Sequence, residues 1–420
     1  MLSPVRRLFR AHPFPNYGIS NIKWYYLVSV FSAGWFIIGN WLFFALRYVT
    51  AYEMTVIEAI SFGIGLAFEI PSGAFADLVG KKRTVQLGLS MEALGLMLFV
   101  SADISKWFLL IGNIIIVGGF AFISGSLEAL AYDSLVEHKK EKHYDEVTSK
   151  THALYPFVFV FTSLSGGLLW KYHEALPFLA TILCVMMAVF CSFKLTEPKV
   201  DTDHFTWLGF IKHNQIGFRQ LLHTDIRRYL PVILTVLATH YMWSTGVIRI
   251  FMASSFGYNG ETLSYLVSVI FAITAVMVFF FDKIRAWLGD ELGIVGLGMV
   301  SALAWFLASV SGNWLYGAII FLLFSTAGNL QQPWTSSLIN SVVPSKYRAT
   351  TLSTMQFLVQ IPYVFIVIFF GKLVEYRQDD LFYIGVGIFT VIALSMTMIR
   401  LATYPAHLRT HRDHYRAKST

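Results

Sequence analysis

Repeated runs of apolar residues, each about 20 residues long, constrain the fold of this chain more than any other feature. A helix of that length crosses the roughly 30 Å hydrocarbon core of a bilayer. Hydrophobic residues make up 56% of the 420 residues and charged residues only 14%, whereas about a quarter of the residues in a soluble domain are charged. We therefore predict an all-α polytopic membrane protein with about twelve spans. The expected spans are residues 25–46, 54–76, 85–103, 107–130, 151–171, 176–195, 229–252, 262–281, 292–311, 314–340, 350–373 and 381–402.

The distribution of positive charge predicts the orientation of these spans. If successive loops alternate between the two sides and the N-terminus lies inside, 26 of the 32 Lys and Arg residues fall in inside segments. Because Lys and Arg resist translocation, we expect a multi-pass protein of the cell (inner) membrane with both termini in the cytoplasm. The first span is expected to direct insertion without a cleaved signal peptide. The net charge of +7 is thus explained by topology, and no nucleic-acid partner is expected.

A polar segment at residues 196–228 is the longest interruption between apolar runs, and it divides the expected spans six and six. Its aromatic and aliphatic residues are spaced for an amphipathic helix on the inner membrane surface. The predicted domains are an N-terminal six-helix bundle (1–195), a cytoplasmic linker with this amphipathic segment (196–228), a C-terminal six-helix bundle (229–403) and a basic cytoplasmic tail (404–420).

The two halves contain sparse matches at a nearly constant separation. Gly125, Leu127, Ser134, Leu135 and Tyr144 recur as Gly328, Leu330, Ser337, Leu338 and Tyr347, and Asp77 and Gly88 recur as Asp282 and Gly293. The matches fall at equivalent places in the two halves. Two related bundles around a midplane site are the architecture of alternating-access transporters.

A basic turn between the second and third expected spans carries the most specific motif. It reads Gly73-Ala-Phe-Ala-Asp77-Leu-Val-Gly80-Lys81-Lys82-Arg83. The glycines permit close helix approach and a sharp turn, and the aspartate at the helix end can pair with cations or cap a neighbouring helix. We expect a charge network that latches the two bundles together on the cytoplasmic side; a merely topogenic basic loop is the alternative. Further expected members of this latch are Glu128, Asp133 and Asp282.

This run resembles the signature that the major facilitator superfamily carries between its second and third helices. Upstream, Glu69-Ile-Pro-Ser-Gly73 resembles a bacterial group in which Glu-x-Pro-(Thr/Ser)-Gly precedes that signature. The resemblance implies two pseudo-symmetric six-helix bundles and a transport cycle, but no particular cargo. Thr162-Ser163 replaces the Gly-Pro that many proton antiporters of the superfamily carry in the fifth helix. The fourth-helix arginine of many members is also missing, and both departures weaken an assignment to drug/proton antiport.

Carboxylates at membrane depth are the candidates for proton coupling. Glu58 and Glu69 lie eleven residues apart on the second expected helix, close to the same face. A charge inside hydrocarbon costs several kcal/mol, about 3 by insertion scales, so such residues are functional candidates. Glu69 is the preferred proton carrier, with a structural tie to an adjacent helix as the alternative. Arg249 either attracts an anionic group or extends its guanidinium to the outer surface.

Candidates for a substrate cavity come from the first, fourth, seventh and tenth helices, which line the cavity in the superfamily. Aromatic walls with a few amides suit an amphipathic or ring-bearing solute. Because aromatic residues make up 16% of the chain, ordinary packing or an interfacial position competes for each of them. The candidates are Trp35, Asn40, Trp41, Asn113, His240, Tyr241, Trp243, Arg249, Asn329, Gln331, Gln332 and Trp334.

These observations favour a proton-coupled secondary active transporter of a small organic solute over an enzyme. The sequence has no phosphate-binding Gly-rich Lys-Ser/Thr loop, metal-spaced Cys/His cluster or nucleophile elbow, and no cofactor is expected. The expected partners are a small-molecule substrate, protons and membrane lipids, and a monomer is expected. Aromatic content favours export over uptake. The alternatives are a nutrient-uptake permease of the same fold, a lipid flippase and a non-transporting sensor or scaffold.

Overall fold

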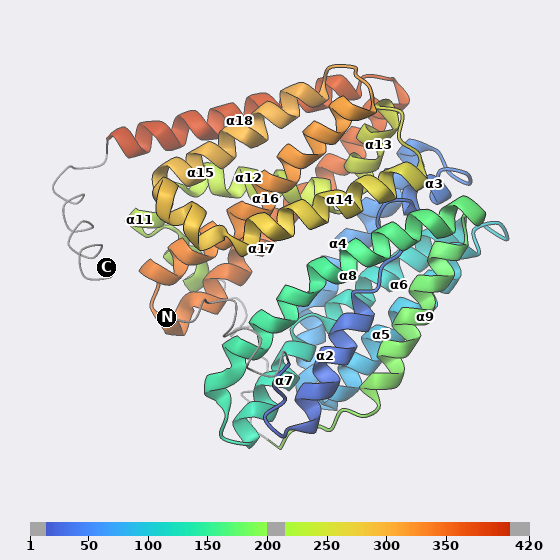
Figure 1. Ribbon diagram of the computed structural model, residues 1–420, viewed down its shortest axis with the longest axis vertical. Coiled ribbons are helices and arrows are strands. Elements are labelled where there is room, and N and C mark those ends of the chain that lie inside the picture. The colour runs from blue at the N-terminus through green and yellow to red at the C-terminus, as the bar shows by residue number, and fades with distance from the viewer. Residues whose placement is uncertain (1–13, 200–214, 404–420) are drawn as a thin grey trace, which may run out of the picture. The chain divides into compact units, whose positions relative to one another are not determined.

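The computed structural model describes residues 14–199 and 215–403, and regular structure in these two ranges is entirely helical (Figure 1). The middle of the expected linker (200–214) and the expected tail (404–420) lie outside the described residues. The helices are α2 (Ser20–Ser32), α3 (Trp41–Ala45), α4 (Ala51–Val79), α5 (Lys81–Val100), α6 (Trp107–Ile123), α7 (Ser126–Glu137), η1 (Glu141–His143), α8 (Tyr144–Tyr172), α9 (Leu176–Ser192), α11 (Thr224–Arg227), α12 (Leu230–Ser244), α13 (Val247–Ser255), α14 (Gly260–Phe279), α15 (Phe281–Ala308), α16 (Trp314–Val342), α17 (Ser345–Glu375) and α18 (Asp379–Ala402).

Most of these helices can cross a membrane. Within the described ranges, nine helical stretches are long and apolar enough to do so, one of which (Trp107–Glu137) combines α6 and α7. A tenth counts if α12 and α13, bent by 72°, form one span. The two remaining expected spans correspond to α9, which has 17 residues, and to α2 with α3. The fold is therefore that of a polytopic helical membrane protein, as the apolar runs predicted.

Three expected spans are interrupted, which corrects their prediction as continuous helices. The first is broken over residues 33–40, between α2 and α3. The fourth is broken between α6 and α7, and the seventh at Gly246, whose φ of +106° is left-handed and therefore favours glycine. Non-helical backbone at membrane depth is stable only where protein groups or a water-filled cavity satisfy it. The breaks differ in their surroundings: Ser124 and Gly125 between α6 and α7 are exposed, whereas most residues of 33–40 are at least partly buried.

Contacts divide the chain into two compact units. Unit 1 comprises Met1–Phe210, Gly246–Ala275 and Val364–Tyr376, and unit 2 comprises Ile211–Thr245, Val276–Tyr363 and Arg377–Thr420. In unit 1, α2, α4, α5, α6, α8 and α9 run side by side (Figure 1). In unit 2, α12, α15, α16 and α18 pack against one another. The domain boundaries expected at residues 195 and 229 stay predictions.

Glycines bring α5 and α6 into backbone contact within unit 1. A Cβ added at Gly95 would lie 2.6 Å from the carbonyl oxygen of Gly112, and one added at Gly112 would lie 2.7 Å from that of Gly95. Gly88 and Gly119 form the same reciprocal contact two turns away. Small residues at a helix interface allow this close approach, in which van der Waals packing replaces the hydrophobic effect that lipid does not supply.

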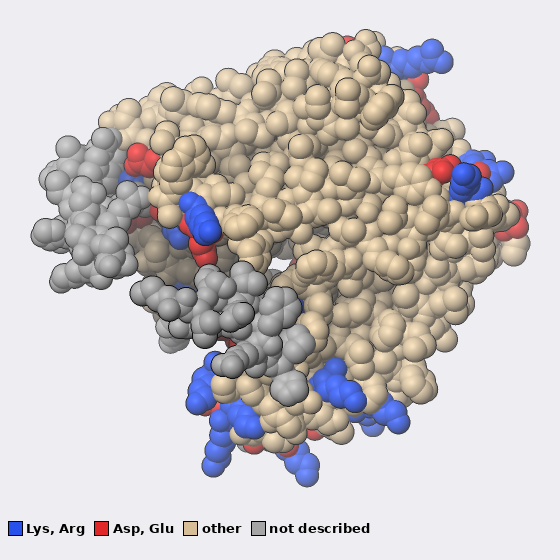
Figure 2. All heavy atoms as spheres, in the orientation of Figure 1, with Lys and Arg blue, Asp and Glu red and all other residues tan. Residues whose placement is uncertain are grey.

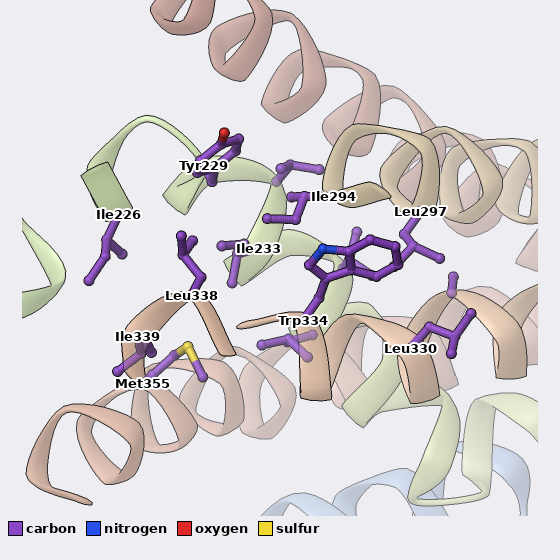
Figure 3. Packing of buried hydrophobic residues seen from close by; sticks show 14 of the residues in the cluster. Ile226, Tyr229, Ile233, Ile294, Leu297, Leu330, Trp334, Leu338, Ile339 and Met355 are labelled. Carbon is purple, nitrogen blue, oxygen red and sulfur yellow. The ribbon is translucent and has the colours of Figure 1, made fainter. Parts of the chain in front are cut away.

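An apolar cluster forms the core of unit 2. Buried together in it are Tyr229, which precedes α12, Ile233 of α12, Ile294 of α15 and Trp334 of α16 (Figure 3). The indole of Trp334 meets the ring of Phe281 edge to face, with ring centroids 5.3 Å apart. The cluster has members from α11, α12, α15, α16, α17 and α18, so it fixes the position of α16 within the unit.

The surface of unit 1 has the charge distribution of a membrane-embedded helix bundle. Lys and Arg side chains gather near the end where α7 leads into α8, whereas the middle of α8 and α9 shows uncharged residues (Figure 2). Large apolar side chains such as Phe157, Phe161 and Leu183 are exposed on that uncharged face. Exposed apolar surface of this extent is unusual for a soluble monomer and is expected against lipid.

Candidate functional site

The non-helical segment 33–40 is held by polar groups from several helices of unit 1. The backbone N–H of Phe36 donates to Thr181 Oγ1 of α9 at 3.0 Å. Asn40 is fully buried, and its Nδ2 donates to the carbonyl oxygen of Gly166 at 3.4 Å and to Ser264 Oγ at 3.3 Å. The break in the first span is thus part of the bundle interior.

Trp35 within this segment contacts a buried carboxylate. Its Nε1–H donates to Glu92 Oε1 of α5 at 3.1 Å, and Glu92 is 0% exposed. The ring of Trp35 also packs against Phe120 of α6, with ring centroids 5.3 Å apart. Among the described residues, Glu92 Oε2 has no hydrogen-bond partner.

A second carboxylate is buried on α4. Glu58 is 3% exposed, and Asn113 of α6 lies beside its carboxyl group. Its Oε2 has no hydrogen-bond partner in the described part of the chain. Glu69, eleven residues further along α4, is exposed. Of the two carboxylates predicted from sequence, only Glu58 is therefore enclosed by protein.

Arg249 is buried in unit 1, so one of the two alternatives predicted for it, extension of its guanidinium to the outer surface, is wrong. It lies on α13 and is 4% exposed. Its Nη2 donates at 2.7 Å to the carbonyl oxygen of Ile38, inside the 33–40 segment. A buried guanidinium is stabilised by such hydrogen bonds. Nearby, Trp41 of α3 packs edge to face against Phe99.

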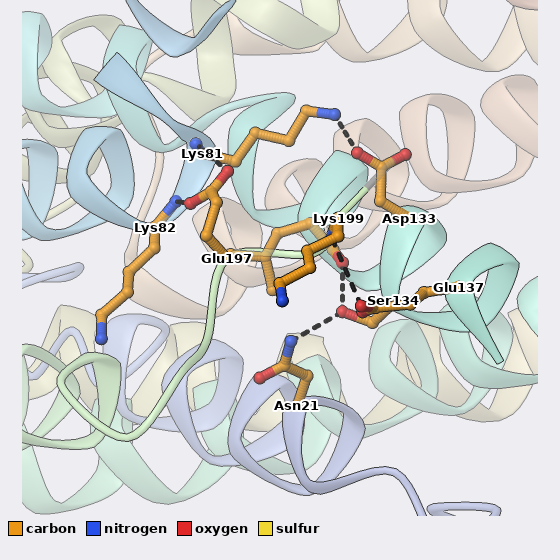
Figure 4. A network of polar contacts seen from close by, with 9 residues as sticks. Asn21, Lys81, Lys82, Asp133, Ser134, Glu137, Glu197 and Lys199 are labelled. Atoms are coloured by element: carbon orange, nitrogen blue, oxygen red, sulfur yellow. Dashed lines mark hydrogen bonds and ion pairs between the residues drawn. The ribbon is translucent and has the colours of Figure 1, made fainter. Parts of the chain in front are cut away.

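The basic turn between α4 and α5 lies in a polar network (Figure 4). Gly80 joins the two helices with φ of +99°. The backbone N–H groups of Lys81 and Lys82 donate to the two carboxylate oxygens of Glu197, at 2.7 and 2.8 Å. Lys81 Nζ forms an ion pair with Asp133 of α7. Glu197 therefore caps the N-terminus of α5, where a negative charge is favoured.

The same network fixes the start of the expected linker. Asn21 of α2 donates to Ser134 Oγ and to the carbonyl oxygen of Thr196, both at 2.8 Å. Its Oδ1 accepts the backbone N–H of Thr196 at 2.8 Å. Close by, Tyr17 donates to Glu146, and burial together with this bond raises the pKa of the Tyr17 hydroxyl. The chain that leaves α9 is thereby bound to α2 and α7.

The other predicted latch residues differ in their burial. Gly73 and Asp77 are partly buried near the end of α4, and Arg83 is exposed in the first turn of α5. Glu128 is exposed on α7, with Oε1 3.7 Å from His152 Nε2. Asp282 is exposed in the first turn of α15. The basic turn thus brings together Lys81 and Asp133 but not Glu128.

The cavity candidates of α12 lie in or beside packed aromatic clusters of unit 2. Trp243 is buried and stacks on Phe324, with ring centroids 6.1 Å apart. Tyr241 meets Tyr363 edge to face at 5.7 Å. His240 is half-buried, and a Cβ added at Gly328 would lie 1.8 Å from its Nδ1.

The candidates on α16 point in different directions around the helix. Gln331 is fully buried, and its Nε2 donates to Thr335 Oγ1 at 3.2 Å. Gln332 is exposed, and half-buried Asn329 donates to the carbonyl oxygen of Ser325 at 2.9 Å. Trp334 lies inside the apolar cluster, where its Nε1 donates to Asp290 Oδ1 at 3.2 Å.

Sequence reasoning missed four polar residues that the structure places at these sites. Glu92, Asn21, Glu197 and Asp290 carry the contacts described above. Glu92 had a usable signal, since it is an acidic residue in the middle of the third apolar run. Asn21, Glu197 and Asp290 lie outside or at the ends of the expected spans, where polar residues are ordinary. Nothing in their local sequence distinguishes them.

The sequence is similar to known proteins along most of its length. A sequence model described as the Major Facilitator Superfamily matches residues 25–367. The protein called uncharacterized transporter BU466, from Buchnera aphidicola subsp. Acyrthosiphon pisum (strain APS), is 23% identical over 341 residues, covering 76% of this chain and 83% of that protein.

Solved transporter structures share the fold at low sequence identity. A bacterial homologue of the human lysosomal transporter Spinster, inward-facing and unoccupied, is similar with a TM-score of 0.69 and 12% identity, covering 94% of this chain and 98% of that one. The nucleoside transporter NupG is similar with a TM-score of 0.65 and 13% identity, covering 93% of this chain and 100% of that one. The POT family transporter PepTSo is similar with a TM-score of 0.68 and 12% identity, covering 92% of this chain and 98% of that one.

Proposed function

This chain belongs to the Major Facilitator Superfamily, and from that premise we propose that it moves a small organic solute by alternating access, coupled to protons. It is a multi-pass membrane transporter of this superfamily. The finer proposal places it in the cell (inner) membrane as a monomer with both termini in the cytoplasm. The positive charge of its inside loops supports that orientation.

The buried carboxylate of Glu58 is the observation on which the proposed proton coupling depends. An ionised carboxylate away from water costs several kcal/mol, about 3 by insertion scales, unless it is paired. Glu58 has the neutral Asn113 beside it and is 3% exposed, so the protonated form suits this environment. Exposure to water on either side would allow the proton to leave. Glu58 thus takes the role that sequence reasoning gave first to Glu69.

Aromatic side chains in unit 1 support an amphipathic or ring-bearing solute. Trp35, Trp41, Phe99 and Phe120 lie close to the segment 33–40 or to each other. Aromatic rings bind ring-bearing solutes by stacking, and nearby amides such as Asn40 supply hydrogen bonds. We propose export as the direction, on the same aromatic content.

The flippase alternative loses its supporting residue. That alternative would be favoured by Arg249 together with a hydrophobic side portal between the bundles. Arg249 is buried and donates to the carbonyl oxygen of Ile38. A soluble solute is therefore favoured over a lipid.

Solute flux in proteoliposomes tests the proposal. A solute is first chosen from a panel of aromatic amphipathic compounds by the rise that it causes in the unfolding temperature. Its flux under an imposed pH gradient is then compared between the parent protein and Glu58→Gln. We expect gradient-driven flux to fall at least tenfold in Glu58→Gln.

Two further variants serve as controls for this flux. Glu53→Gln changes a partly buried glutamate in the first turn of the same helix, which pairs with Lys106. Glutamine preserves the capping of α4, and we expect unchanged flux. Glu69→Gln tests the other carboxylate predicted from sequence. Full gradient-driven flux in Glu58→Gln would refute the assignment to Glu58.

A further inference from the structure

We propose that Glu92 of α5 is a second proton-binding site and that Trp35 couples its protonation to the position of the 33–40 segment. This inference rests on the proton-coupled transport proposed above. It assigns a function to a residue that lies outside the signature and outside the candidates predicted from sequence. Its geometry is independent of Glu58, so the two can be tested separately.

The surroundings of Glu92 leave room for a proton but not for a solute. The side chain is 0% exposed. A Cβ added at Gly119 of α6 would lie 3.1 Å from the backbone nitrogen of Glu92, so the two helices already touch at this level. The indole of Trp35 covers the carboxyl group from the first span. A proton has no volume to accommodate, which makes it the ligand that fits.

The hydrogen bonding of Glu92 matches a protonated carboxyl group. Oε1 accepts the indole N–H of Trp35 at 3.1 Å, as a carbonyl oxygen does. Oε2, which has no partner among the described residues, carries the proton. An ionised Glu92 with one neutral donor would be a buried, uncompensated charge. Release of the proton to water therefore requires that the carboxyl group become accessible.

Ionisable groups on the helices packed against α5 do not compensate that charge. α6 contains no ionisable residue, and α9 contains only two cysteines. On α7, Asp133 is paired with Lys81, and Glu128 and Glu137 are exposed. On α4, whose charged residues are all acidic, Glu53 pairs with Lys106 and Glu58 lies beside Asn113. Glu69 is exposed, and Asp77 is near the end of the helix. The hydrogen-bond donor to Glu92 is Trp35, whose backbone lies in the break between α2 and α3.

A native cysteine lies against the same break and can report its movement. A Cβ added at Gly34 would lie 2.7 Å from Cβ and 2.9 Å from Sγ of Cys184. Because Gly34 is next to Trp35, displacement of the indole from Glu92 would uncover this thiol. Cys191, the other cysteine, is buried near the C-terminal end of α9.

Infrared difference spectroscopy of the full-length protein in lipid tests protonation without knowledge of the solute. The C=O stretch of a protonated carboxyl group is recorded while the pH is raised. We expect Glu92→Gln to lose one component of this band. Trp35→Phe, which keeps Glu92 but removes the indole donor, is expected to move that component to higher frequency. An unchanged band in Glu92→Gln, or an unshifted band in Trp35→Phe, would overturn the assignment.

Thiol labelling tests the coupling to segment 33–40. The rate of maleimide labelling of Cys184 is measured against pH in a Cys191→Ser background, with and without Glu92→Gln. Ionisation of the thiol raises both labelling rates equally. The rate with Glu92 present, divided by the rate in Glu92→Gln, therefore isolates the effect of Glu92. We expect this ratio to rise at least threefold as the pH increases. A constant ratio would refute the coupling.

These outcomes separate the two proposals. If Glu92→Gln loses a component of the carboxyl band while Glu58→Gln keeps full gradient-driven flux, Glu92 is a proton site and Glu58 is not. If the band is unchanged in Glu92→Gln while Glu58→Gln loses the flux, Glu58 is a proton site and Glu92 is not.

Discussion

Gly80 shows how a single residue of the signature motif determines local geometry. It ends α4 and precedes α5 with φ of +99°, and a Cβ there would lie 3.0 Å from the Glu197 carboxylate. Sequence reasoning predicted the sharp turn from this glycine and from its basic neighbours. It did not predict Glu197, because the carboxylate that caps α5 comes from a segment more than a hundred residues away.

Substitution of Gly80 tests that contact. We expect Gly80→Ala to destabilise the protein by about 1–3 kcal/mol, because the left-handed backbone strains a side chain and the new methyl group displaces Glu197. Gly125→Ala is the matched control, with φ of +70° and no atom within 4 Å of the added Cβ. In Gly125→Ala, only backbone strain lowers the free energy of unfolding. Thermal unfolding in detergent measures the stability of both variants, and an equal loss of stability in the two would contradict the role of Glu197.

At the scale of helices, the positions of most spans followed from hydropathy, whereas their breaks did not. The break at 33–40 is bound by Thr181 of α9 and Arg249 of α13. At the break beside Gly246, a Cβ added to the glycine would lie 2.7 Å from Nε1 of Trp41 on α3. A single apolar run contains no record of those contacts. The internal repeat also failed to predict the breaks. Gly125 ends the break in the fourth span, whereas its counterpart Gly328 lies inside the continuous α16.

The glycine contact between α5 and α6 gives a prediction at this scale. Gly95→Ala places a methyl group 2.6 Å from the carbonyl oxygen of Gly112, so the helices must separate. We expect a loss of about 1–3 kcal/mol, typical of overpacking. Gly296→Ala on α15 is the control, because nothing lies within 4 Å of its added Cβ. There we expect no loss, or a gain of up to about 1 kcal/mol from helix propensity.

Unfolding temperature and α-helical circular dichroism in detergent measure both variants. A Gly95→Ala protein as stable as the Gly296→Ala protein would show that α5 and α6 tolerate a wider separation.

For the whole molecule, sequence predicted the superfamily fold but only part of the candidate site. Charge asymmetry is an average over the whole sequence, and the basic turn is a local motif. Both can therefore be recognised from the sequence alone. A buried polar contact such as that between Trp35 and Glu92 joins two helices. Predicting such a contact requires knowing which sides of the two helices pack together, and hydropathy does not contain that information.

Orientation in the membrane is a prediction for the whole molecule. Lys142 lies between α7 and α8, in a loop expected inside, and Asp103 lies between α5 and α6, in a loop expected outside; both are exposed. In a background of Cys184→Ser and Cys191→Ser, we expect an impermeant maleimide to label Asp103→Cys but not Lys142→Cys in intact cells. The reverse pattern would invert the topology.

The most direct test of the central claim is to measure proton movement driven by the solute alone. Proteoliposomes that contain a pH-sensitive dye receive an outward gradient of the chosen solute, with no imposed pH gradient. The parent protein is predicted to change the internal pH as the solute moves, and Glu58→Gln is predicted to leave it constant. Solute movement through the parent protein at constant internal pH would contradict proton coupling.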